Sequence, residues 1–444
     1  MTALEQLGAF VANYQPDGHA RAAVRLHAAD TIGAWIAACG TPEGRALLAF
    51  RKDANALADR VAINVALARL SEIDDIHLGA MVTPGAIVIP AALVIAASLP
   101  DVAADDLTAA IVAGYEATIR LGAAIDGPGV LYRGIWPTYF AAPFGAAAVA
   151  ARLLRLDDKQ AANALATALI MAAPGAGHHA APTTARWLAV GHAAGRGLQA
   201  ALAAGAGFTS DLKIAEGDFL KNVFGLTTNP VLLGGGLGGL ALDQTSFKPW
   251  CAARQTMAAT QALKEVLADG IAADTILRIG VAVLPPHVKM IDHGVTVGDR
   301  FSHLTSVQYQ MAVAALAPDL AYGLGGPAGA VSPALAAFMA RIQVRAEESL
   351  LTAGRPEEAY PKVWPAHVTV TASGRRERTV THVPGDPSRP FGEADLKAKF
   401  VRVVAPLLDR DRAEAEFAAA LSALERPAAF IREIGQIGAG RQGA

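Results

Sequence analysis

Hydrophobic residues recur at steps of three and four through most of the first 245 positions. Between residues 21 and 39 this spacing places them on one side of a helical wheel, which predicts an amphipathic helix. Two later segments, 107–122 and 144–156, are apolar almost all round. Helices with this pattern are buried among other helices. The first half of the chain therefore predicts a large helical domain.

The pattern changes after the glycine cluster Gly234–Gly239, which we interpret as a hinge between domains. Beyond it, alternating and β-branched residues predict strands, and Ser373-Gly374 predicts the turn of a hairpin. A helical pattern returns from Glu393. We expect a mainly α protein with an α+β part: an all-helical domain of residues 1–245 and 395–444, and a smaller inserted α+β domain of residues 246–394. The predicted strands are 275–283, 367–371 and 378–383, and the predicted helices between them are 302–316 and 334–342.

The most apolar stretch of the chain is segment 84–99. It is shorter than the roughly 20 residues that a membrane-spanning helix needs. It also contains Pro90 and lies just after the acidic pair Asp74-Asp75. We interpret it as a buried core helix and expect no membrane partner.

The composition excludes several classes of protein. Hydrophobic residues make up 53% of the chain, charged residues 18%, and the formal net charge is -2. This hydropathy excludes disorder, and the chain lacks the basic excess that phosphate binding needs, so we expect no nucleic-acid partner. Two cysteines, Cys39 and Cys251, cannot form a disulfide framework. The first ten residues have no basic segment before an apolar stretch. We therefore expect a cytoplasmic protein.

The segment 71–85 is unusually polar for this chain. Carboxylates that enter an apolar core must be paired, protonated or functional. Asp74 and His77 are spaced like two metal ligands on one helical turn, but no second set of ligands follows, so we expect no metal. The alternative interpretation is a solvated loop with a helix cap. The charged and titratable residues of the segment are Glu72, Asp74, Asp75 and His77.

Two further polar islands interrupt the apolar pattern. Lys248 precedes Pro249 and lies near Arg254. A lysine in such surroundings binds an anion or has a lowered pKa, and the alternative is a surface lysine on the linker. The other island contains His178-His179 and Arg186. Because adjacent residues of a helix point in different directions, at most one of the two histidines serves a given site.

Together the three islands supply carboxylates, histidines and cations, without a nucleophile–base triad or a cofactor fingerprint. This set suits acid–base chemistry on an anionic substrate. Removing a proton next to a carboxylate builds up negative charge, which positioned lysine and arginine side chains stabilise. We therefore expect an enzyme that needs no cofactor.

In these residues the chain resembles the MmgE/PrpD family, which includes 2-methylcitrate dehydratase, cis-aconitate decarboxylase and iminodisuccinate epimerase. The resemblance runs nearly end to end, and the order and spacing of its segments make it specific. The segments are 72–93 (EIDDIHL…TPGAIVIPAAL), 114–122 (GYEATIRLG), 136–157, 186–194 (RWLAVGHAA), 207–219, 248–251 (KPWC) and 385–400.

The resemblance implies a large all-helical domain built from both chain ends, an inserted α+β domain and a homodimer. It also implies catalysis on small polycarboxylates without a metal. By the same resemblance the active site lies between the domains, with Asp75 and His77 on one side and Lys248 on the other.

The chain keeps only part of the residue pattern of the dehydratases and decarboxylases. Lys248 and Tyr309 match it. The loss of two histidines changes the proton carriers, whereas the cations that hold carboxylates are kept. The departures are Glu72 for the first aspartate of DFDDT, Ile76 for its threonine, Thr83 and Trp136 for the two histidines, and Arg186 for a lysine.

We predict a cofactor-independent lyase or isomerase that removes a proton α to a carboxylate of a small di- or tricarboxylic acid. Lys248 and His77 would transfer protons, and Asp75 would orient or act as base. Tyr139 and Tyr309 would donate hydrogen bonds. The substrate-binding candidates are Arg186, Asp74, Thr83, Trp136, His178 and Arg254.

Three alternatives stay open at this point. The reaction is either an elimination of the dehydratase or decarboxylase type, or an epimerisation of the iminodisuccinate type. A non-catalytic polycarboxylate-binding protein with the family fold is the competing hypothesis of another class, supported by Thr83 and Trp136. A metal-dependent hydrolase is a more distant third.

Overall fold

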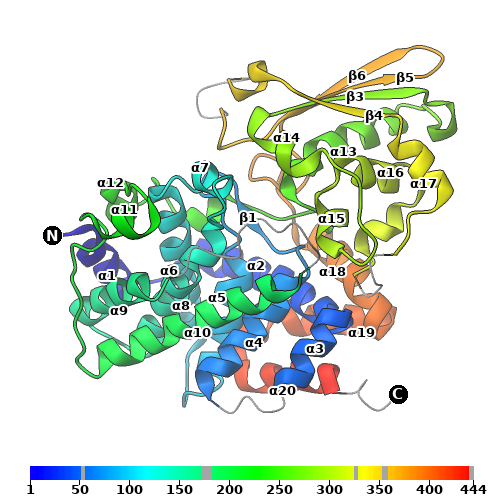
Figure 1. Cartoon of the computed structure of the whole chain (residues 1–444). Helices are drawn as coiled ribbons and strands as arrows, with labels where there is room; N and C mark the ends of the chain where they lie inside the picture. Colours follow the sequence, from blue (N-terminus) through cyan, green and yellow to red (C-terminus); the bar gives the residue numbers. More distant parts are fainter. Residues whose placement is uncertain (52–55, 173–182, 325–328, 353–358, 440–444) are drawn as a thin grey trace. The chain divides into compact units, whose positions relative to one another are not determined.

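The computed structural model describes residues 1–51, 56–172, 183–324, 329–352 and 359–439. The chain forms two compact units (Figure 1). Unit 1 consists mainly of the chain up to Ser246 and the chain from Gly392 onward. Unit 2 consists mainly of Phe247–Phe391. The boundaries predicted from the sequence were 245/246 and 394/395.

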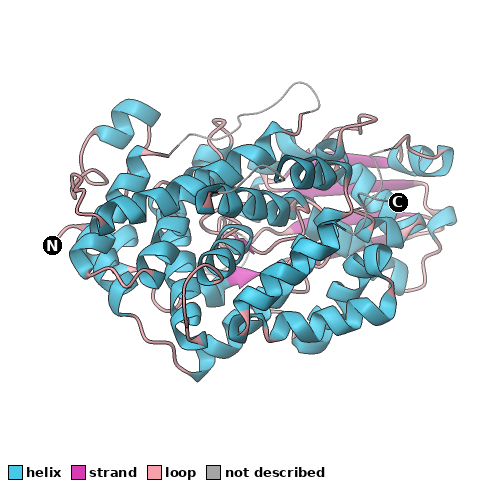
Figure 2. Ribbon diagram, turned by 90° about the horizontal axis from the view of Figure 1, so that it is seen from below, coloured by secondary structure: helices cyan, strands magenta, loops and turns pink. Residues whose placement is uncertain are grey.

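Unit 1 is built from helices, with one two-stranded ribbon (Figures 1 and 2). The ribbon pairs β1 (Ile76–His77) with β2 (Thr245–Ser246) in antiparallel register, so that His77 faces Thr245. The helices are α1 (Ala3–Asn13), α2 (Gly18–Cys39), α3 (Pro42–Arg51), α4 (Leu57–Leu70), α5 (Gly85–Ala96), α6 (Ala104–Ala124), α7 (Gly127–Leu131), α8 (Pro137–Leu153), α9 (Asp158–Ile170), α10 (Ala185–Gly205), α11 (Phe219–Phe224), α12 (Pro230–Gly235), α18 (Glu393–Leu408), α19 (Arg410–Leu421) and α20 (Pro427–Ala439).

The predicted core helix is confirmed as α5, in which every residue is buried and Pro90 lies inside the helix. Small residues let the neighbouring helices approach closely. A Cβ atom added to Gly191 of α10 would lie 2.1 Å from the carbonyl oxygen of Ala62 in α4. Among the described residues, no helix is both long and apolar enough to cross a membrane.

The two ends of the chain meet inside unit 1. Helices α18 and α19 pack against α2, and α20 packs against α5 (Figure 1). The ammonium group of Lys399 in α18 lies 2.5 Å from a carboxylate oxygen of Asp30 in α2 and donates to the carbonyl oxygen of Ile73 at 3.0 Å. Because Lys399 and Asp30 are both buried, this ion pair joins the chain ends in the interior of the unit.

Unit 2 contains a four-stranded sheet in the order β4-β3-β5-β6. The pair β3–β4 is parallel, and the other two pairs are antiparallel. Inward-facing residues of β5, namely Ala366, Val368 and Val370, belong to the core of the unit, against which α13 and α16 also pack. The strands are β3 (Arg278–Val283), β4 (Ile342–Ala346), β5 (Ala366–Thr371) and β6 (Arg375–Val380), and the helices are α13 (Arg254–Ala268), α14 (Pro285–Ile291), α15 (Arg300–Thr305), α16 (Val307–Leu316) and α17 (Pro333–Met339).

The structure corrects several details predicted from the pattern. The helix expected over 302–316 is two helices, because Ser306 is extended and its hydroxyl caps α16. The helix expected over 334–342 ends at Met339, and β4 begins at Ile342. The second hairpin strand begins at Arg375 rather than Arg378.

The glycine cluster is not a hinge between the units, because unit 1 continues to Ser246. Gly234 and Gly235 end α12, and Gly236, Gly238 and Gly239 have positive φ angles. The cluster therefore ends a helix and turns the chain within unit 1.

Candidate active site

The loop between α4 and α5 begins with an unusual backbone conformation. Glu72 has a φ of 57°, in the left-handed region that residues other than glycine rarely adopt. Such conformations cost roughly 1–3 kcal/mol and gather at functional sites. Glu72 is also largely buried, with 7% of its surface exposed. The fold therefore holds a carboxylate in place at some cost in stability.

Two carboxylates of this loop pair with the same arginine. Arg69, in the last turn of α4, places its Nη1 atom 2.5 Å from Glu72 Oε2 and 3.1 Å from Asp74 Oδ1. Burial alone would lower the pKa of Arg69, but the carboxylates of Asp74 and Glu72 raise it above its ordinary value. Arg69 therefore stays charged and compensates part of the buried negative charge.

A second buried arginine lies among aromatic rings. Arg186, at the start of α10, is 2% exposed. Its guanidinium carbon lies 4.3 Å from the ring centre of Trp136, 6.0 Å from Tyr139 and 5.9 Å from Trp187. Its Nε atom also donates a hydrogen bond to the Tyr139 hydroxyl at 3.2 Å. Cation–π contacts within about 6 Å stabilise a cation that has been removed from water.

Glu72 connects the two arginines. Its Oε1 atom accepts a hydrogen bond from the indole nitrogen of Trp187 at 3.2 Å and lies 3.7 Å from Arg186 Nη2. The latter distance is longer than a hydrogen bond, so Glu72 acts on Arg186 through this atom pair mainly by charge. We call this group the arginine–glutamate cluster. Its members are Arg69, Glu72, Asp74, Trp136, Tyr139, Arg186 and Trp187.

Asp75 belongs to a different network, in which both of its oxygens accept hydrogen bonds. Oδ1 accepts from the backbone N–H of Gly85 at 2.8 Å. Oδ2 accepts from the Tyr115 hydroxyl at 2.6 Å and lies 2.8 Å from His27 Nδ1. Burial, followed by the charge of Asp75, raises the pKa of Tyr115 well above its usual value, so this phenol remains a donor. The geometry suits an orienting role for Asp75 better than a role as free base.

Gly85 is required at the start of α5 because the Asp75 network fills the space above it. An added Cβ atom would lie 2.6 Å from the Thr31 hydroxyl, 2.7 Å from Asp75 Oδ1 and 2.8 Å from the Tyr115 hydroxyl. The Pro84-Gly85 pair thus lets the helix N-terminus approach the carboxylate.

His77 lies in β1 and is 5% exposed. Its Nδ1 atom accepts a hydrogen bond from the backbone N–H of Ala80 at 3.1 Å. The proton of the neutral ring is therefore on Nε2, which is buried. Burial lowers the pKa of His77 to about 4, while Gln244 acts in the opposite direction. His77 is a neutral ring that presents an N–H donor.

Thr83 contacts the beginning of α8. Its backbone N–H donates to the Thr138 hydroxyl at 3.0 Å, and its own hydroxyl lies 3.4 Å from the same oxygen. Thr138 precedes Tyr139 in the chain, and Trp136 is the N-cap of the helix. The start of α8 thus positions Trp136 and Tyr139 and also binds the loop that carries Thr83.

The remaining described candidates lie in unit 2. Lys248 is 3% exposed. Arg254 is fully buried, and its Nη2 atom lies 2.9 Å and 2.6 Å from the two carboxylate oxygens of Asp386. Asp386 also accepts from the backbone N–H of Val383 at 2.8 Å. Arg254 therefore has a supporting contact in unit 2, which sequence reasoning did not foresee.

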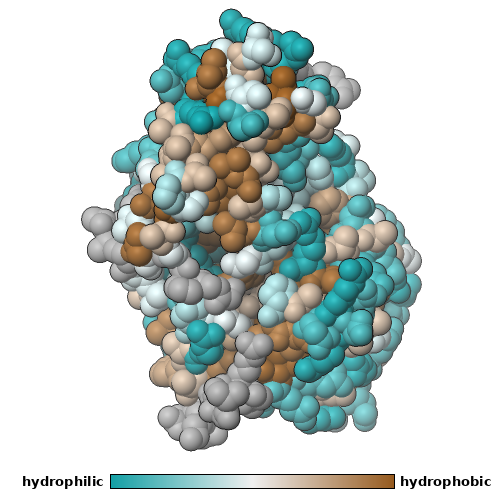
Figure 3. Space-filling model, turned by 90° about the vertical axis from the view of Figure 1, so that its right-hand side faces the viewer, coloured by the Kyte–Doolittle hydropathy of each residue, from teal (hydrophilic) through white to brown (hydrophobic). Residues whose placement is uncertain are grey.

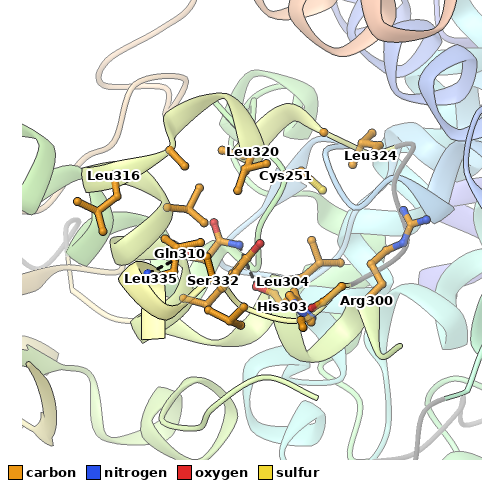
Figure 4. A pocket seen from close by; sticks show the side chains of 18 of the residues that line it. Cys251, Arg300, His303, Leu304, Gln310, Leu316, Leu320, Leu324, Ser332 and Leu335 are labelled. Carbon is orange, nitrogen blue, oxygen red and sulfur yellow. Dashed lines mark hydrogen bonds between the residues drawn. The ribbon is translucent and has the colours of Figure 1, made fainter. Parts of the chain in front are cut away.

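Tyr309 lies in α16 and lines a cavity of about 460 Å³ in unit 2 (Figure 4). Its ring meets that of His303 edge-on, with centres 4.8 Å apart. Partial burial raises the pKa of Tyr309 above its usual value. Tyr309 therefore belongs to a pocket that the hydrophobic pattern did not predict.

The last candidate, His178, lies outside the described residues. Within the described residues, no group of three or more histidine, cysteine, aspartate or glutamate side chains is arranged to hold a metal ion.

Sequence reasoning missed several partners of the site. Glu72 was noticed as a departure from a pattern but was not selected as a site residue. His27 and Tyr115 were also missed, since they lie on α2 and α6, far from Asp75 in the sequence. The available signal was that polar residues inside apolar helical segments must find buried partners.

Sequence comparison relates both units to one family. The MmgE/PrpD N-terminal domain matches residues 58–225. The MmgE/PrpD C-terminal domain matches residues 250–423. Compared with the curated proteins, the chain has no match. The two domain matches together cover most of the chain, including the arginine–glutamate cluster and His77. Lys248 and Pro249 lie between the two matches, and the rest of the segment 248–251 lies within the second.

Proposed function

Because this chain belongs to the MmgE/PrpD family, we propose that it removes a proton from the carbon α to a carboxylate of a small di- or tricarboxylic acid. Membership in the family indicates an enzyme of the dehydratase or lyase type. The substrate class, the independence from metals and cofactors, the cytoplasmic location and the homodimer are parts of the proposal.

The arginine–glutamate cluster is the observation that carries this proposal. Its charges balance, with Arg69 and Arg186 against Glu72 and Asp74. The Nη2 atom of Arg186 lies 3.7 Å from Oε1 of Glu72, which is longer than a hydrogen bond. This separation is compatible with a substrate carboxylate that replaces Glu72 as the contact of the guanidinium. Arginine presents a planar fork of N–H donors that matches a carboxylate. Arg186 is therefore our candidate for binding one substrate carboxylate.

We assign proton removal to Lys248 and stabilisation of the resulting negative charge to His77. The C–H proton moves to the lysine nitrogen, and the electron pair moves into the adjacent carboxylate. The Nε2–H group of neutral His77 is the kind of donor that stabilises such developing charge. Asp75 then acts as a positioning residue, since its hydrogen bond to Gly85 fixes the loop that carries His77.

Epimerisation is the second candidate outcome, and Thr83 and Trp136 favour it. Expulsion of a hydroxyl group as water needs an acid that donates a proton. Neither a threonine hydroxyl nor an indole N–H is acidic enough for this role near neutral pH. Epimerisation has no leaving group to protonate, but inversion requires a proton to reach the opposite face of the carbon from a second donor, for which Tyr139 is our candidate.

Proton NMR in D₂O tests the function directly. Citrate, cis-aconitate, malate and aspartate are incubated with the full-length protein, and loss of the C–H signal is followed together with the appearance of new products. Solvent deuterium at the α-carbon without an alkene favours epimerisation, and an alkene identifies elimination. A polycarboxylate that binds without exchange or turnover would contradict the enzymatic proposal and favour the non-catalytic binding protein.

Three variants locate the chemistry. We expect Lys248→Met to lose proton exchange while still binding the acid, and Arg186→Met to lose binding. Lys159→Met is the matched control, since Lys159 is an exposed lysine of α9. Full turnover by Lys248→Met would remove Lys248 from the mechanism.

A further inference from the structure

We propose that the buried ion pair between Glu116 and Arg120 of α6 positions His77, by fixing the segment of chain that forms β2. The proposal rests on the function proposed above, in which His77 stabilises the developing negative charge. It gives a positioning role to two residues that have no part in the acid–base chemistry described so far. All of the contacts involved lie within unit 1.

Both charged side chains of the pair are buried. Glu116 has no exposed surface and Arg120 is 7% exposed, whereas hydrophilic residues are spread over the face of the molecule in Figure 3. Arg120 Nε donates to Glu116 Oε2 at 2.7 Å, and the guanidinium carbon lies 4.7 Å from the ring centre of Phe10. The attraction between two buried charges offsets their loss of hydration only where further hydrogen bonds satisfy them. The other hydrogen bonds of the pair therefore indicate its role.

These other hydrogen bonds go to the main chain that leads to β2. Glu116 Oε1 accepts from the backbone N–H of Ala241 at 2.6 Å, and Arg120 Nη1 donates to the carbonyl oxygen of Gly234 at 3.2 Å. Between these two points Gly236 has a φ of 81°, and an added Cβ atom would lie 3.0 Å from Arg120 Nη2. Because glycines leave the backbone free to adopt many conformations, this turn needs contacts that define its path. The ion pair supplies them at both ends of the turn.

Ala241 connects the ion pair to β2. It begins the short 3-10 helix η1 (Ala241–Gln244), and its carbonyl oxygen accepts a hydrogen bond from the Thr245 hydroxyl at 3.2 Å. Thr245 is the residue of β2 that lies opposite His77 in the ribbon. Burial lowers the pKa of His77 to about 4, and the side chain of Gln244 opposes this effect. Two hydrogen bonds and one strand pairing therefore link the ion pair to the histidine.

His77 depends on this support because β1 is only two residues long. A two-stranded ribbon is marginally stable by itself. On the other side of β1, the backbone N–H of His77 donates to the carbonyl oxygen of Val82 at 2.8 Å, so β1 lies between a turn and β2. A donor stabilises developing charge only where it is held in place beforehand, and a displacement of about 1 Å can lower a rate about a hundredfold. Loosening β2 should therefore slow the reaction.

Nitrogen NMR of the labelled full-length protein tests the positioning without a substrate. In wild type we expect a fixed His77 tautomer with the proton on Nε2, because Ala80 donates to Nδ1. Glu116→Met and Thr245→Val should each move the ring signals toward the average of two tautomers. Thr245→Val removes one hydroxyl group and no charge, so it is decisive even where Glu116→Met does not fold. Leu165→Ala opens a cavity in α9 of the same unit and should keep the wild-type signals.

Kinetics separate positioning from a general loss of stability. The probe is whichever of citrate, cis-aconitate, malate and aspartate exchanges its C–H proton in D₂O. Glu116→Met should lower kcat about tenfold or more and change KM less than about twofold, because His77 acts in the transition state. Glu116→Gln keeps an acceptor for the Ala241 N–H and should recover most of kcat. In a His77→Leu background, Glu116→Met should cause little further loss, because the ring that it positions is gone.

Asp105→Asn is the matched control, because Asp105 lies on the same helix and pairs with Arg21 at the surface. It should leave the NMR signals and kcat unchanged. The proposal is wrong if the His77 signals of Thr245→Val match those of wild type, or if the losses of Glu116→Met and His77→Leu are additive. An absence of proton exchange with all four acids would contradict the proposed function alone, since the NMR measurement still decides whether the ion pair positions His77.

Discussion

The guanidinium carbon of Arg186 lies 4.3 Å from the ring centre of Trp136. These two residues are also two of the positions at which the chain departs from the residue pattern that it resembles, where a lysine and a histidine are expected. Arginine stacks on aromatic rings better than lysine does, and tryptophan is the strongest aromatic partner for a cation. The arginine at 186 and the tryptophan at 136 therefore suit each other, because their side chains stack in this structure.

This contact predicts that changes at the two positions are coupled. Arg186→Lys should raise the KM for the polycarboxylate about tenfold or more, because the planar fork of donors is lost. Trp136→Leu should weaken substrate binding by about 1–2 kcal/mol, the range of a desolvated cation–π contact. The measurement is steady-state kinetics on both single variants and the double variant. Strictly additive effects would show that the stacking contact contributes nothing to binding.

The tautomer of His77 makes a prediction that does not depend on activity. Nitrogen NMR of the labelled protein at pH 7 should show a neutral ring with its proton on Nε2, because Ala80 donates to Nδ1. For the reaction, His77→Gln should retain more activity than His77→Leu, since only glutamine keeps an N–H donor. A kcat/KM profile with an ionisation of His77 between pH 6 and 8 would contradict the pKa of about 4.

Two buried histidines predict how stability depends on pH. Burial lowers the pKa of His77 to about 4, and burial together with Arg254 lowers that of His287 to about 3, from 6.5 in both cases. Between these values and 6.5 the unfolded chain binds more protons than the folded one, so the free energy of unfolding falls as the pH falls. From pH 7 to pH 5 the loss should be about 2 kcal/mol for each histidine.

Urea unfolding at several pH values measures this loss. His287→Phe keeps an aromatic ring between Tyr360 and Trp364 and should remove one of the two contributions. His192→Gln, at an exposed position of α10, is the control and should show the full wild-type slope. If the free energy of unfolding falls with pH equally steeply in wild type and His287→Phe, then His287 has the same pKa in the folded and unfolded chains.

The Lys399–Asp30 pair predicts a large effect from one methionine substitution. Lys399→Met leaves the buried carboxylate of Asp30 without its cation and should lower the free energy of unfolding by about 3–5 kcal/mol. Lys397→Met is the matched control, because Lys397 lies on the same helix and pairs with Glu414 at the surface. It should leave stability nearly unchanged. Similar unfolding midpoints for the two variants would refute the importance of the buried pair.

The helical half of the fold was predictable because its signal is local. The apolar segment that became α5 shows its burial directly in the sequence, and the 21–39 pattern became α2. The strand β4 was missed because its short pattern follows a helix without a break in hydrophobicity. The break at Ser306 was missed because a serine cap inside an apolar run depends on one backbone angle.

The candidate site was predictable only in its composition. Charged residues inside an apolar chain identified the segment 72–77 and Arg186 as exceptional. Their partners could not be read from spacing, since Asp75 contacts Tyr115 forty residues later and Glu72 contacts Trp187 more than a hundred residues later. The left-handed backbone of Glu72 also has no signature in the sequence, because glutamate seldom adopts it.

The buried contact between α2 and α18 has a consequence for protein synthesis. Asp30 leaves the ribosome about 370 residues before Lys399, which neutralises it. Unit 2 lies almost wholly within this interval, whereas unit 1 also needs residues from Gly392 onward. A nascent chain therefore carries an unfinished helical unit until residues beyond Gly392 have been synthesised. Premature termination after unit 2 would leave the buried position of Asp30 without the cation that pairs with it.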